Sequence, residues 1–236
     1  MKEHFDNKFI DDINETLGDN YFSPILDWVF SQDRIKSVCD VGCGNGVFTG
    51  DIKQKFECDK LIGVDSNQYA LEQASNLDFD EIIKVSDFTQ DTIPIESSSF
   101  DLVICKDVLE HLIDPLFLTC EIARILKTDG YFLVHVPNHF PFWGRLKFLF
   151  KNDIDTFSYF PDSSRYDFPH IRFFTLASME DLLNLSGFKV VKNISYFFAQ
   201  PPLLHRIMSI RFRKFLTNLS TDNFSEGITL LARKVD

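Results

Sequence analysis

Three glycines in the first half of the chain are spaced in a way that points directly to ligand binding. The segment VCDVGCGNGVFTG, residues 38–50, places Gly42, Gly44 and Gly46 directly after an apolar run. Glycines at such a turn leave backbone N–H groups uncovered, so a ligand can approach them closely. The spacing is G-x-G-x-G, and Val47 stands where the G-x-G-x-x-G pattern of pyrophosphate-binding folds would have its last glycine.

Two carboxylates near this turn suit a cofactor that carries an ammonium group and a ribose. Asp40 lies two residues before Gly42, where its charge would repel a pyrophosphate but would accept hydrogen bonds from an amino-acid ammonium group. Asp65 ends the apolar run LIGVD and is placed to accept hydrogen bonds from both ribose hydroxyls. Its alternative role is to cap the following helix, for which Ser66 is equally suited. Together these features favour S-adenosylmethionine over a dinucleotide.

Short apolar runs alternate with amphipathic segments around these residues. The runs expected to form strands are SVCDVG, LIGVD, IIKV, FDLVIC and YFLVHV, and helices are expected up to about residue 56, over 67–77 and over 115–127. The last of these helices begins with Asp114 as N-cap and Pro115 in its first turn, and Gly130 follows its end. Such alternation predicts an α/β fold with a parallel sheet and helices on both faces.

The flanking segments are less regular. Residues 1–31 have helical periodicity and are predicted to cover the sheet, whereas residues 36–136 form the cofactor-binding core. We expect a helix from Leu176 that stops at Gly187, a strand in FKVVKNISYF and a last strand in GITLLARKV. Insertions are predicted at 137–172 and 199–224, within a single domain of residues 1–236. The first insertion is rich in aromatic residues, and we expect it to close over the acceptor site.

Composition excludes several classes of protein. The net charge of −11 argues against a nucleic-acid partner, which would need a dense basic face. No run approaches the roughly 18 apolar residues of a membrane span, and the start MKEHFDNKF lacks the apolar segment of a signal peptide, so a cytoplasmic protein is expected. The five cysteines show no C-x-x-C pair and no zinc spacing, so we predict reduced thiols and no metal site.

One basic stretch departs from the acidic balance. Between Leu182 and Thr221 there is no acidic residue, and the second insertion carries an apolar stripe at helical spacing. The stripe comprises Leu204, Ile207, Met208, Phe212, Phe215, Leu216 and Leu219. The segment FWGRLKFLFK at 142–151 also mixes aromatic and basic residues. Such segments can lie at a membrane surface or over an anionic, lipid-linked substrate; a helix packed on the core with a basic outer face is the alternative.

Four segments resemble the successive motifs of class I S-adenosylmethionine-dependent methyltransferases. They are VCDVGCGNGVF, LIGVDSN, KVSDF and SFDLVICKDVLEHLIDP, over roughly residues 30–138. ILKTDGYFLVHVPN, HIRFFT and SGFKVV are similar to the small-molecule branch, which includes the ubiquinone-biosynthesis O-methyltransferases and the methionine-biosynthesis protein W group. The resemblance implies a Rossmann-like, mostly parallel seven-stranded sheet whose last strand is antiparallel. It also implies methyl transfer to a small-molecule, sugar or lipid-linked acceptor, with S-adenosylhomocysteine as product.

The resemblance also implies a role for individual residues at the cofactor site. The methionyl end of the cofactor would be held by Asp40, Gly42, Gly44 and Gly46. The ribose would be held by Asp65 and Ser66, and the adenine by Asp87 and Phe88. The floor under the sulfonium would be lined by Lys106, Asp107 and Val108. Glu110 and His111 belong to an LEH element that is often structural in this branch.

A catalytic base is needed only if the acceptor is a hydroxyl, because alignment of the reacting atoms alone can supply roughly 7 to 11 kcal/mol. His139 and His170 border the first insertion and are the candidate bases, whereas His135 lies in a strand pattern and suits the core. A non-catalytic cofactor-binding or partner protein of the same fold is the main alternative. A nicotinamide-dependent oxidoreductase is disfavoured by the glycine spacing, and a pure interaction module would have no use for Asp40 and Asp65.

Overall fold

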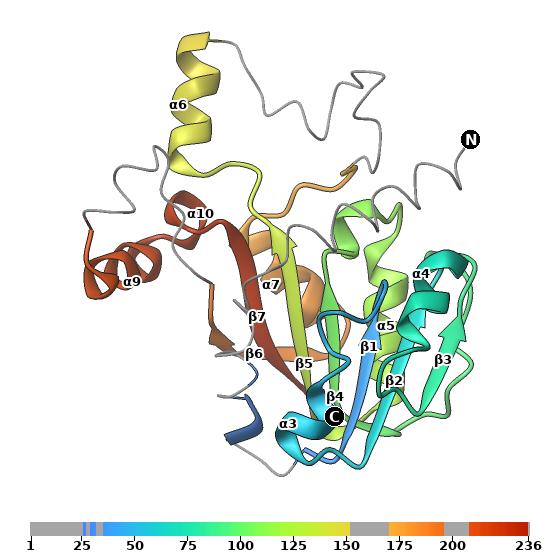
Figure 1. Cartoon of the computed structure of the whole chain (residues 1–236). Helices are drawn as coiled ribbons and strands as arrows, with labels where there is room; N and C mark the ends of the chain where they lie inside the picture. The colour runs from blue at the N-terminus through green and yellow to red at the C-terminus, as the bar shows by residue number, and fades with distance from the viewer. Residues whose placement is uncertain (1–25, 27–28, 32–34, 152–169, 196–207, 236) are drawn as a thin grey trace.

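A seven-stranded sheet forms the centre of the molecule (Figure 1). The computed structural model describes residues 26, 29–31, 35–151, 170–195 and 208–235. The strands are β1 (Ser37–Val41), β2 (Lys60–Asp65), β3 (Glu81–Lys84), β4 (Phe100–Lys106), β5 (Leu126–Pro137), β6 (Phe188–Asn193) and β7 (Gly227–Lys234). Their order is β3-β2-β1-β4-β5-β7-β6, and β7 runs antiparallel to both of its neighbours. The predicted fold class is therefore confirmed.

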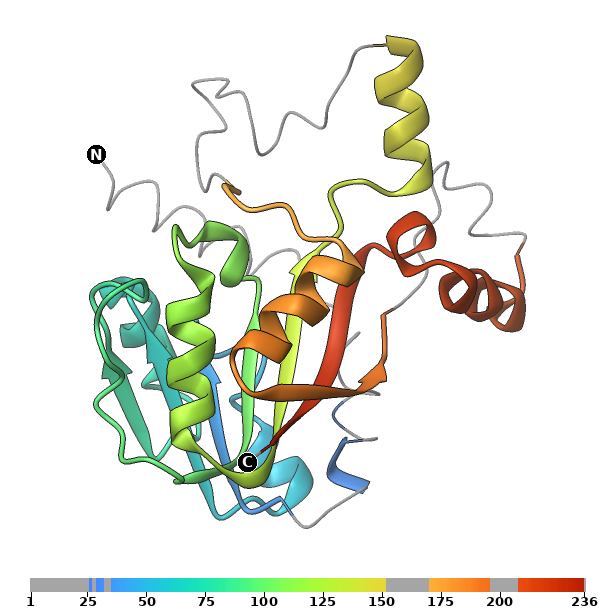
Figure 2. The ribbon, with the colours of Figure 1, turned by 180° about the vertical axis from the view of Figure 1, so that it is seen from behind.

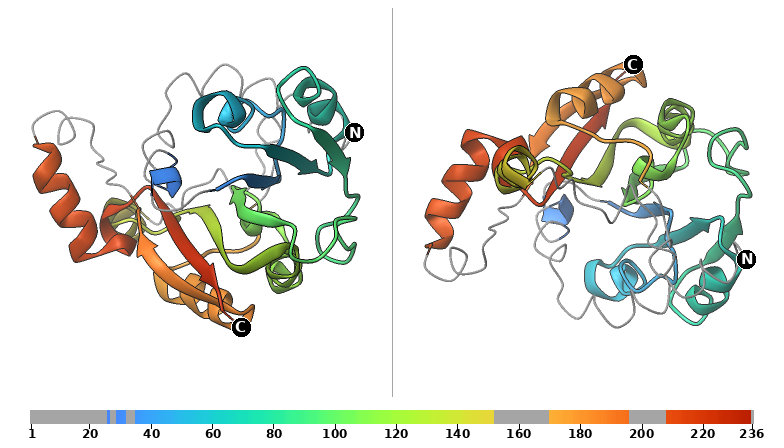
Figure 3. Two further views of the ribbon diagram at one scale, coloured as in Figure 1. Left: turned by 90° about the horizontal axis from the view of Figure 1, so that it is seen from below. Right: turned by 90° about the horizontal axis from the view of Figure 1, so that it is seen from above.

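Helices cover both faces of the sheet. Helices α3 (Ile52–Phe56) and α4 (Gln68–Ala74) lie on one face, and α5 (Pro115–Ile125) and α7 (Leu176–Leu185) lie on the other (Figure 3). Figure 2, the view turned by 180°, shows α5 and α7 in front of the sheet. None of the helices in the described part of the chain has the length and hydropathy that a bilayer crossing requires.

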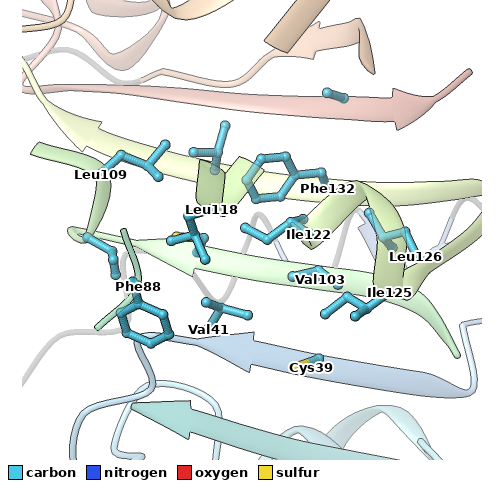
Figure 4. Close-up of a cluster of buried hydrophobic side chains, with 14 of the residues drawn as sticks. Cys39, Val41, Phe88, Val103, Leu109, Leu118, Ile122, Ile125, Leu126 and Phe132 are labelled. Atoms are coloured by element: carbon cyan, nitrogen blue, oxygen red, sulfur yellow. The ribbon is translucent and has the colours of Figure 1, made fainter. Parts of the chain in front are cut away.

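The larger core lies between the sheet and the α5–α7 layer. Leu118, Ile122 and Ile125 of α5 are buried against strand residues such as Val103 and Phe132 (Figure 4). Their spacing places them on one helical stripe, which is why α5 packs with a single face. The side chain of Asp114 caps this helix as predicted, accepting hydrogen bonds from the backbone N–H groups of its first turn.

A smaller core lies on the opposite face. Leu26 and Val29 pack there with Ile52 of α3 and with strand residues that include Val38 and Leu61. These two are among the few described residues of the predicted covering helices, and residues 1–25 fall outside the described part. Leu26 and Val29 therefore lie against this face of the sheet, and the covering role of the whole segment stays a prediction.

Several predicted element boundaries were wrong. The helix after the glycine turn starts only at Ile52, because residues 46–51 form tight turns in which Gly50 N donates to Gly46 O at 2.8 Å. Glycine at both positions disfavours a regular helix. Helix α4 ends at Ala74 rather than residue 77, and α5 ends at Ile125, where the extended backbone of Leu126 enters β5 directly.

The two insertions contain helices at the edge of the sheet where the parallel strands end (Figure 1). Helix α6 (Phe142–Lys151) lies in the first, and α9 (Ile210–Leu219) and α10 (Thr221–Phe224) lie in the second. The rings of Phe142 and Phe224 are 6.2 Å apart and join α6 to α10. Residues 152–169 and 199–207 lie outside the described residues, so the expected lid is only partly described.

Candidate functional site

The carboxyl ends of the central strands bring the predicted cofactor residues together. Strand β1 pairs in parallel with β2 and β4, with Val41 opposite Val64 on one side and Cys105 on the other. The glycine turn after β1, Asp65 at the end of β2 and Lys106 at the end of β4 therefore lie at one edge of the sheet. This edge is the usual ligand crevice of an open α/β sheet.

The glycine turn has one open side and one closed side. Gly42, Gly44 and Gly46 all have positive φ angles, of 80°, 53° and 78°, which favour glycine. A Cβ added at Gly42 would lie 2.1 Å from the Cγ2 atom of Val108, whereas a Cβ added at Gly44 would meet nothing within 4 Å. Gly44 thus presents its backbone to open space, and Gly42 packs inward against the β4 turn.

Asp65 is tied to this turn and does not cap the next helix. Its Oδ2 atom accepts a 2.8 Å hydrogen bond from Gly44 N, and its Oδ1 atom accepts one of 2.8 Å from Asn67 N. The N-cap of α4 is Asn67, whose side chain accepts from Ala70 N. The exposed Ser66 takes no part in that cap. A carboxylate has about four acceptor positions, so Asp65 has the capacity to bind ribose hydroxyls as well.

Asp40 lies beneath the turn with only 2% of its surface exposed. The hydroxyl of Thr49 donates a 2.5 Å hydrogen bond to its Oδ2 atom. Burial raises the pKa of Asp40 to about 7, and the nearby negative charge of Asp65 adds to this, while Thr49 and Lys106 oppose it. A cation bound beside Asp40 would favour its ionised form.

The turn after β3 is held by Asp87, but Phe88 lies in the core. The Asp87 side chain accepts hydrogen bonds from the backbone and hydroxyl of Thr89, at 2.8 and 2.6 Å. Phe88 is only 6% exposed and packs in the larger core beside Val41 (Figure 4). Its apolar ring is buried against the sheet, and the adenine-covering role that the resemblance implied stays a prediction.

The end of β4 contacts the glycine turn through Val108. Asp107 has a positive φ of 55°, which turns the chain back after Lys106. The Lys106 ammonium group pairs with the Asp107 carboxylate and lies 5.6 Å from the centre of the Phe48 ring. Val108 is buried against Gly42. Lys106 and Val108 therefore lie beside the turn, and Asp107 reverses the chain between them.

An open surface hollow of about 670 Å³ lies on the outer side of the turn, towards α3 and α4. Gly46 and Val47 line it, but Asp40 and Asp65 do not. We locate the candidate cofactor site by its polar groups and not by this hollow, because Asp40 and Asp65 can recognise an ammonium group and a ribose.

The two candidate bases form a pair. His139 Nε2 and His170 Nδ1 are 2.6 Å apart, although the residues are 31 positions apart in the sequence. The edge-to-face contact of His139 with Phe173, at 4.9 Å between ring centres, supports the same arrangement. The sequence predicted each histidine separately, and the structure brings both together.

Glu110 lies beside the candidate base His170, a position that its assignment to an LEH element did not predict. It is fully buried, and neither carboxylate oxygen has a hydrogen-bond partner in the described part of the structure. Burial, reinforced by the charge of Asp107, holds its pKa well above the usual range. A charged residue inside the apolar run VLEHL was the available signal.

The segment that carries His170 is anchored to the 3-10 helix η1 (Leu109–His111). The backbone N–H groups of Ile171 and Arg172 donate to Glu110 O at 2.8 and 3.0 Å. The rings of His111 and His170 are 4.8 Å apart in an edge-to-face contact. These contacts place the end of the first insertion against the chain that follows β4.

His135 belongs to the core, as expected. Its Nδ1 atom lies 2.7 Å from the hydroxyl of Thr229 on β7, and burial lowers its pKa to about 4. The ring is therefore neutral at physiological pH.

Comparison with known proteins gives consistent matches. A family model described as a methyltransferase domain matches residues 3–193. The chain is 32% identical over 124 residues to an uncharacterised 37.1 kDa protein of a Streptomyces fradiae transposon, covering 50% of this chain and 35% of that protein. It is 29% identical over 117 residues to a ubiquinone biosynthesis O-methyltransferase of Neisseria meningitidis, covering 46% of this chain and 47% of that protein. The chain thus spans less than half the length of these curated relatives.

Solved structures share the fold at low sequence identity. An S-adenosylmethionine-dependent methyltransferase from Thermotoga maritima matches with a TM-score of 0.64 and 19% identity, covering 99% of this chain and 100% of that one. A Haloferax volcanii protein in complex with a methyltransferase activator matches with a TM-score of 0.65 and 17% identity, covering 98% of each chain.

Proposed function

We propose, on the premise that this chain belongs to the methyltransferase domain family, that it transfers the methyl group of S-adenosylmethionine to a small-molecule, sugar or lipid-linked acceptor. The observation that carries the proposal is the glycine turn with Asp40 beneath it and Asp65 bonded to it. S-adenosylmethionine is the cofactor that this family and fold imply.

The residues at the turn fit this cofactor. Gly44 faces open space, so a methionyl group can lie against the backbone, and Asp40 supplies a carboxylate for its ammonium group. Asp65, on the neighbouring strand, supplies acceptors for the ribose, and Asp87 lies at the end of the third strand for the adenine. When bound, the cofactor supplies an electrophilic methyl group on a sulfonium.

The chain's own contribution to methyl transfer is alignment and proton removal. Residues at the ends of β1, β2 and β4 orient the donor, and the described end of the first insertion, which is bonded to Glu110 O after β4, helps to hold the acceptor. We assign the catalytic role to the His139–His170 pair, in which one imidazole can take the proton of an acceptor hydroxyl while the other orients it. A carboxylate acceptor, or an amine already in its neutral form, would not need this step.

The surface around the acceptor side favours an amphiphilic, lipid-linked acceptor. On α6, the side chains of Phe148, Leu149 and Phe150 are exposed, the last of them by 78%. On α9, Phe212 and Phe215 are also exposed. Neither helix contains an acidic residue, although the whole chain has a net charge of −11. Exposed aromatic and basic residues on helices suit contact with an anionic membrane surface.

We also propose a cytoplasmic location and no nucleic-acid partner. All five cysteines are free and four are buried, which suits a reducing compartment. The acidic net charge opposes binding to phosphate backbones.

Calorimetry with S-adenosylhomocysteine, NAD and NADP tests the cofactor assignment. We expect one S-adenosylhomocysteine to bind per chain and no heat from either nicotinamide cofactor. No heat from S-adenosylhomocysteine or S-adenosylmethionine with folded protein would overturn the proposal. Release of S-adenosylhomocysteine in the presence of phenolic, sugar and lipid-linked acceptors then separates an enzyme from a non-catalytic binding protein of the same fold.

A further inference from the structure

We propose that Glu110, His111 and His170 form a binding site for a divalent first-row transition-metal ion such as Zn²⁺. Each residue offers one ligand atom, and within the described residues these three atoms all lie within 4.8 Å of one another. The residues come from the 3-10 helix η1 and from the end of the first insertion, so the fold and not a sequence motif brings them together.

The buried carboxylate of Glu110 points to a cation. Its Oε1 and Oε2 atoms are buried and accept no hydrogen bond from any described residue. A carboxylate in such surroundings is either protonated or compensated by a positive charge. The Nε2 atom of His111 lies 3.9 Å from Oε1, too far for a hydrogen bond but within the reach of two ligands of one ion. A metal ion between these groups would give the buried carboxylate a partner.

The donor set decides the class of metal. Two imidazoles and one carboxylate match the His₂Glu arrangement of open zinc sites and the facial arrangement of iron sites. Mg²⁺ and Ca²⁺ prefer sets made of oxygen atoms. Three protein ligands leave at least one position for water or for an acceptor oxygen. Ligand bonds of roughly 2.0 to 2.2 Å require these side chains to draw closer by about an ångström.

His139 is placed to accept a hydrogen bond from His170 when His170 binds the metal ion. A metal-bound imidazole usually gives its second N–H group to a nearby acceptor, which fixes its tautomer and orientation. The 2.6 Å contact between His139 Nε2 and His170 Nδ1 supplies this partner. The bonds from Ile171 N and Arg172 N to Glu110 O fix the two halves of the site relative to each other.

The role of the ion rests on the proposed function. An acceptor hydroxyl bound at the open position would become more acidic and release its proton to solvent. The oxygen would then form a bond to the methyl carbon as the sulfur–carbon bond breaks, which leaves neutral S-adenosylhomocysteine. With an ion bound, His170 would be a ligand and His139 a positioning residue, so the ion would take over the activation of the hydroxyl that the histidine pair performs without it.

Titration of the chelator-stripped full chain with Co²⁺ alone tests the site, with visible absorption as the readout and Zn²⁺ as the competitor. We expect one ion per chain. His170→Ala should weaken Co²⁺ binding at least about tenfold, and His139→Ala should weaken it by roughly 10- to 100-fold. Glu110→Gln should also weaken binding. Glu121→Gln is the matched control, because that carboxylate pairs with Arg124 on α5, and it should bind Co²⁺ normally.

Thermal melting and S-adenosylhomocysteine binding monitor folding in each variant. If Glu110→Gln does not fold, the half-buried His170 and His139 still carry the test. Absent Co²⁺ binding in a folded chain, or equal binding in His170→Ala and the parent, would overturn the metal site. Normal S-adenosylhomocysteine binding in that case would leave the proposed function standing. Co²⁺ binding by a folded chain that binds no S-adenosylhomocysteine would instead overturn the proposed function and leave the metal site standing.

Discussion

Asp65 accepts two backbone hydrogen bonds at the point where the glycine turn meets β2. Replacing it with alanine should weaken S-adenosylhomocysteine binding by roughly 2 to 4 kcal/mol, because the ribose hydroxyls lose a charged acceptor. The free energy of unfolding should also fall, by about 1 to 3 kcal/mol, because Gly44 N and Asn67 N lose their acceptor. Calorimetry measures the first and denaturant unfolding the second. Ser66→Ala, at the exposed neighbouring position, is the control; normal binding by Asp65→Ala would contradict the assignment.

Asp40 makes cofactor affinity depend on pH. Its pKa is about 7 in the protein without cofactor, and binding of an ammonium group requires the ionised form. S-adenosylhomocysteine affinity should therefore be at its plateau above pH 7 and fall towards tenfold per pH unit well below it. Calorimetry between pH 5.5 and about 8.5 would measure this. In Asp40→Asn the plateau should be lower and the profile flat; a pH-independent parent would show that Asp40 does not face the ammonium group.

The raised pKa of Asp40 also makes the free energy of unfolding depend on pH. Its folded pKa is raised above the unfolded value of 3.8, so the protonated carboxyl favours the native state at low pH. This contribution is lost as pH rises from about 4 through 7, and Asp40→Asn should remove it.

Gly42 and Gly44 should respond differently to alanine. Gly42→Ala would push a methyl group into Val108 and would also strain a left-handed backbone, so it should cost about 2 to 5 kcal/mol of stability. Gly44→Ala meets no neighbour, so its cost is the roughly 1 to 2 kcal/mol of a left-handed backbone. Its methyl group lies on the open side, and cofactor affinity should fall more than stability. Thermal melting with and without S-adenosylhomocysteine separates the loss of stability from the loss of affinity. If Gly44→Ala lowered the Tm equally with and without S-adenosylhomocysteine, the cofactor would not lie against Gly44.

At the scale of elements, α6 and α9 carry the predicted membrane contact. Replacing Phe148, Leu149 and Phe150 together by serine should greatly reduce sedimentation with vesicles rich in phosphatidylglycerol, since these side chains are exposed. Binding of the parent should weaken with added salt and on neutral phosphatidylcholine vesicles. Leu185→Ser on α7, equally exposed, is the control. No vesicle binding by the parent would remove the support for a lipid-linked acceptor.

Sequence patterns predicted elements better than their ends. The alternation of apolar runs gave the parallel strands, and Asp114 with Pro115 marked the start of α5 correctly. The start of α3 was wrong because the paired turns at Gly46 and Gly50 depend on packing against Leu77, a contact that periodicity does not contain. The burial of Phe88 is likewise set by the sheet beneath it, and its adenine-covering role stays a prediction.

The acceptor side was predicted least completely. His139 and His170 were identified from their positions beside an insertion, but their contact with each other and the proximity of Glu110 are long-range features of the fold. The spacing of residues along the chain does not predict contacts between residues that are far apart in the sequence. The cofactor side was more accessible because its groups follow directly from the ends of consecutive strands.

At the scale of the whole molecule, cofactor binding should stabilise the native state by mass action. At a free concentration 100 times the Kd, S-adenosylhomocysteine should add about 2.7 kcal/mol, which raises the Tm by roughly 5 to 11 °C for a domain of this size. NAD at equal concentration should have no effect. Differential scanning calorimetry measures this shift; an unchanged Tm with saturating S-adenosylhomocysteine would contradict cofactor binding to the folded chain.

The position of β7 has a consequence for how the chain is made. Strand β7 lies between β5 and β6, although it follows both in the sequence, and His135 on β5 meets its partner Thr229 from 94 residues later. A ribosome therefore releases β5 and β6 before the strand that joins them exists. Until translation passes residue 234, β5 has an unpaired edge that can template association with other chains. Completion of this sheet therefore waits for residues 227–234, and nascent chains stalled before Gly227 should need a chaperone to stay monomeric.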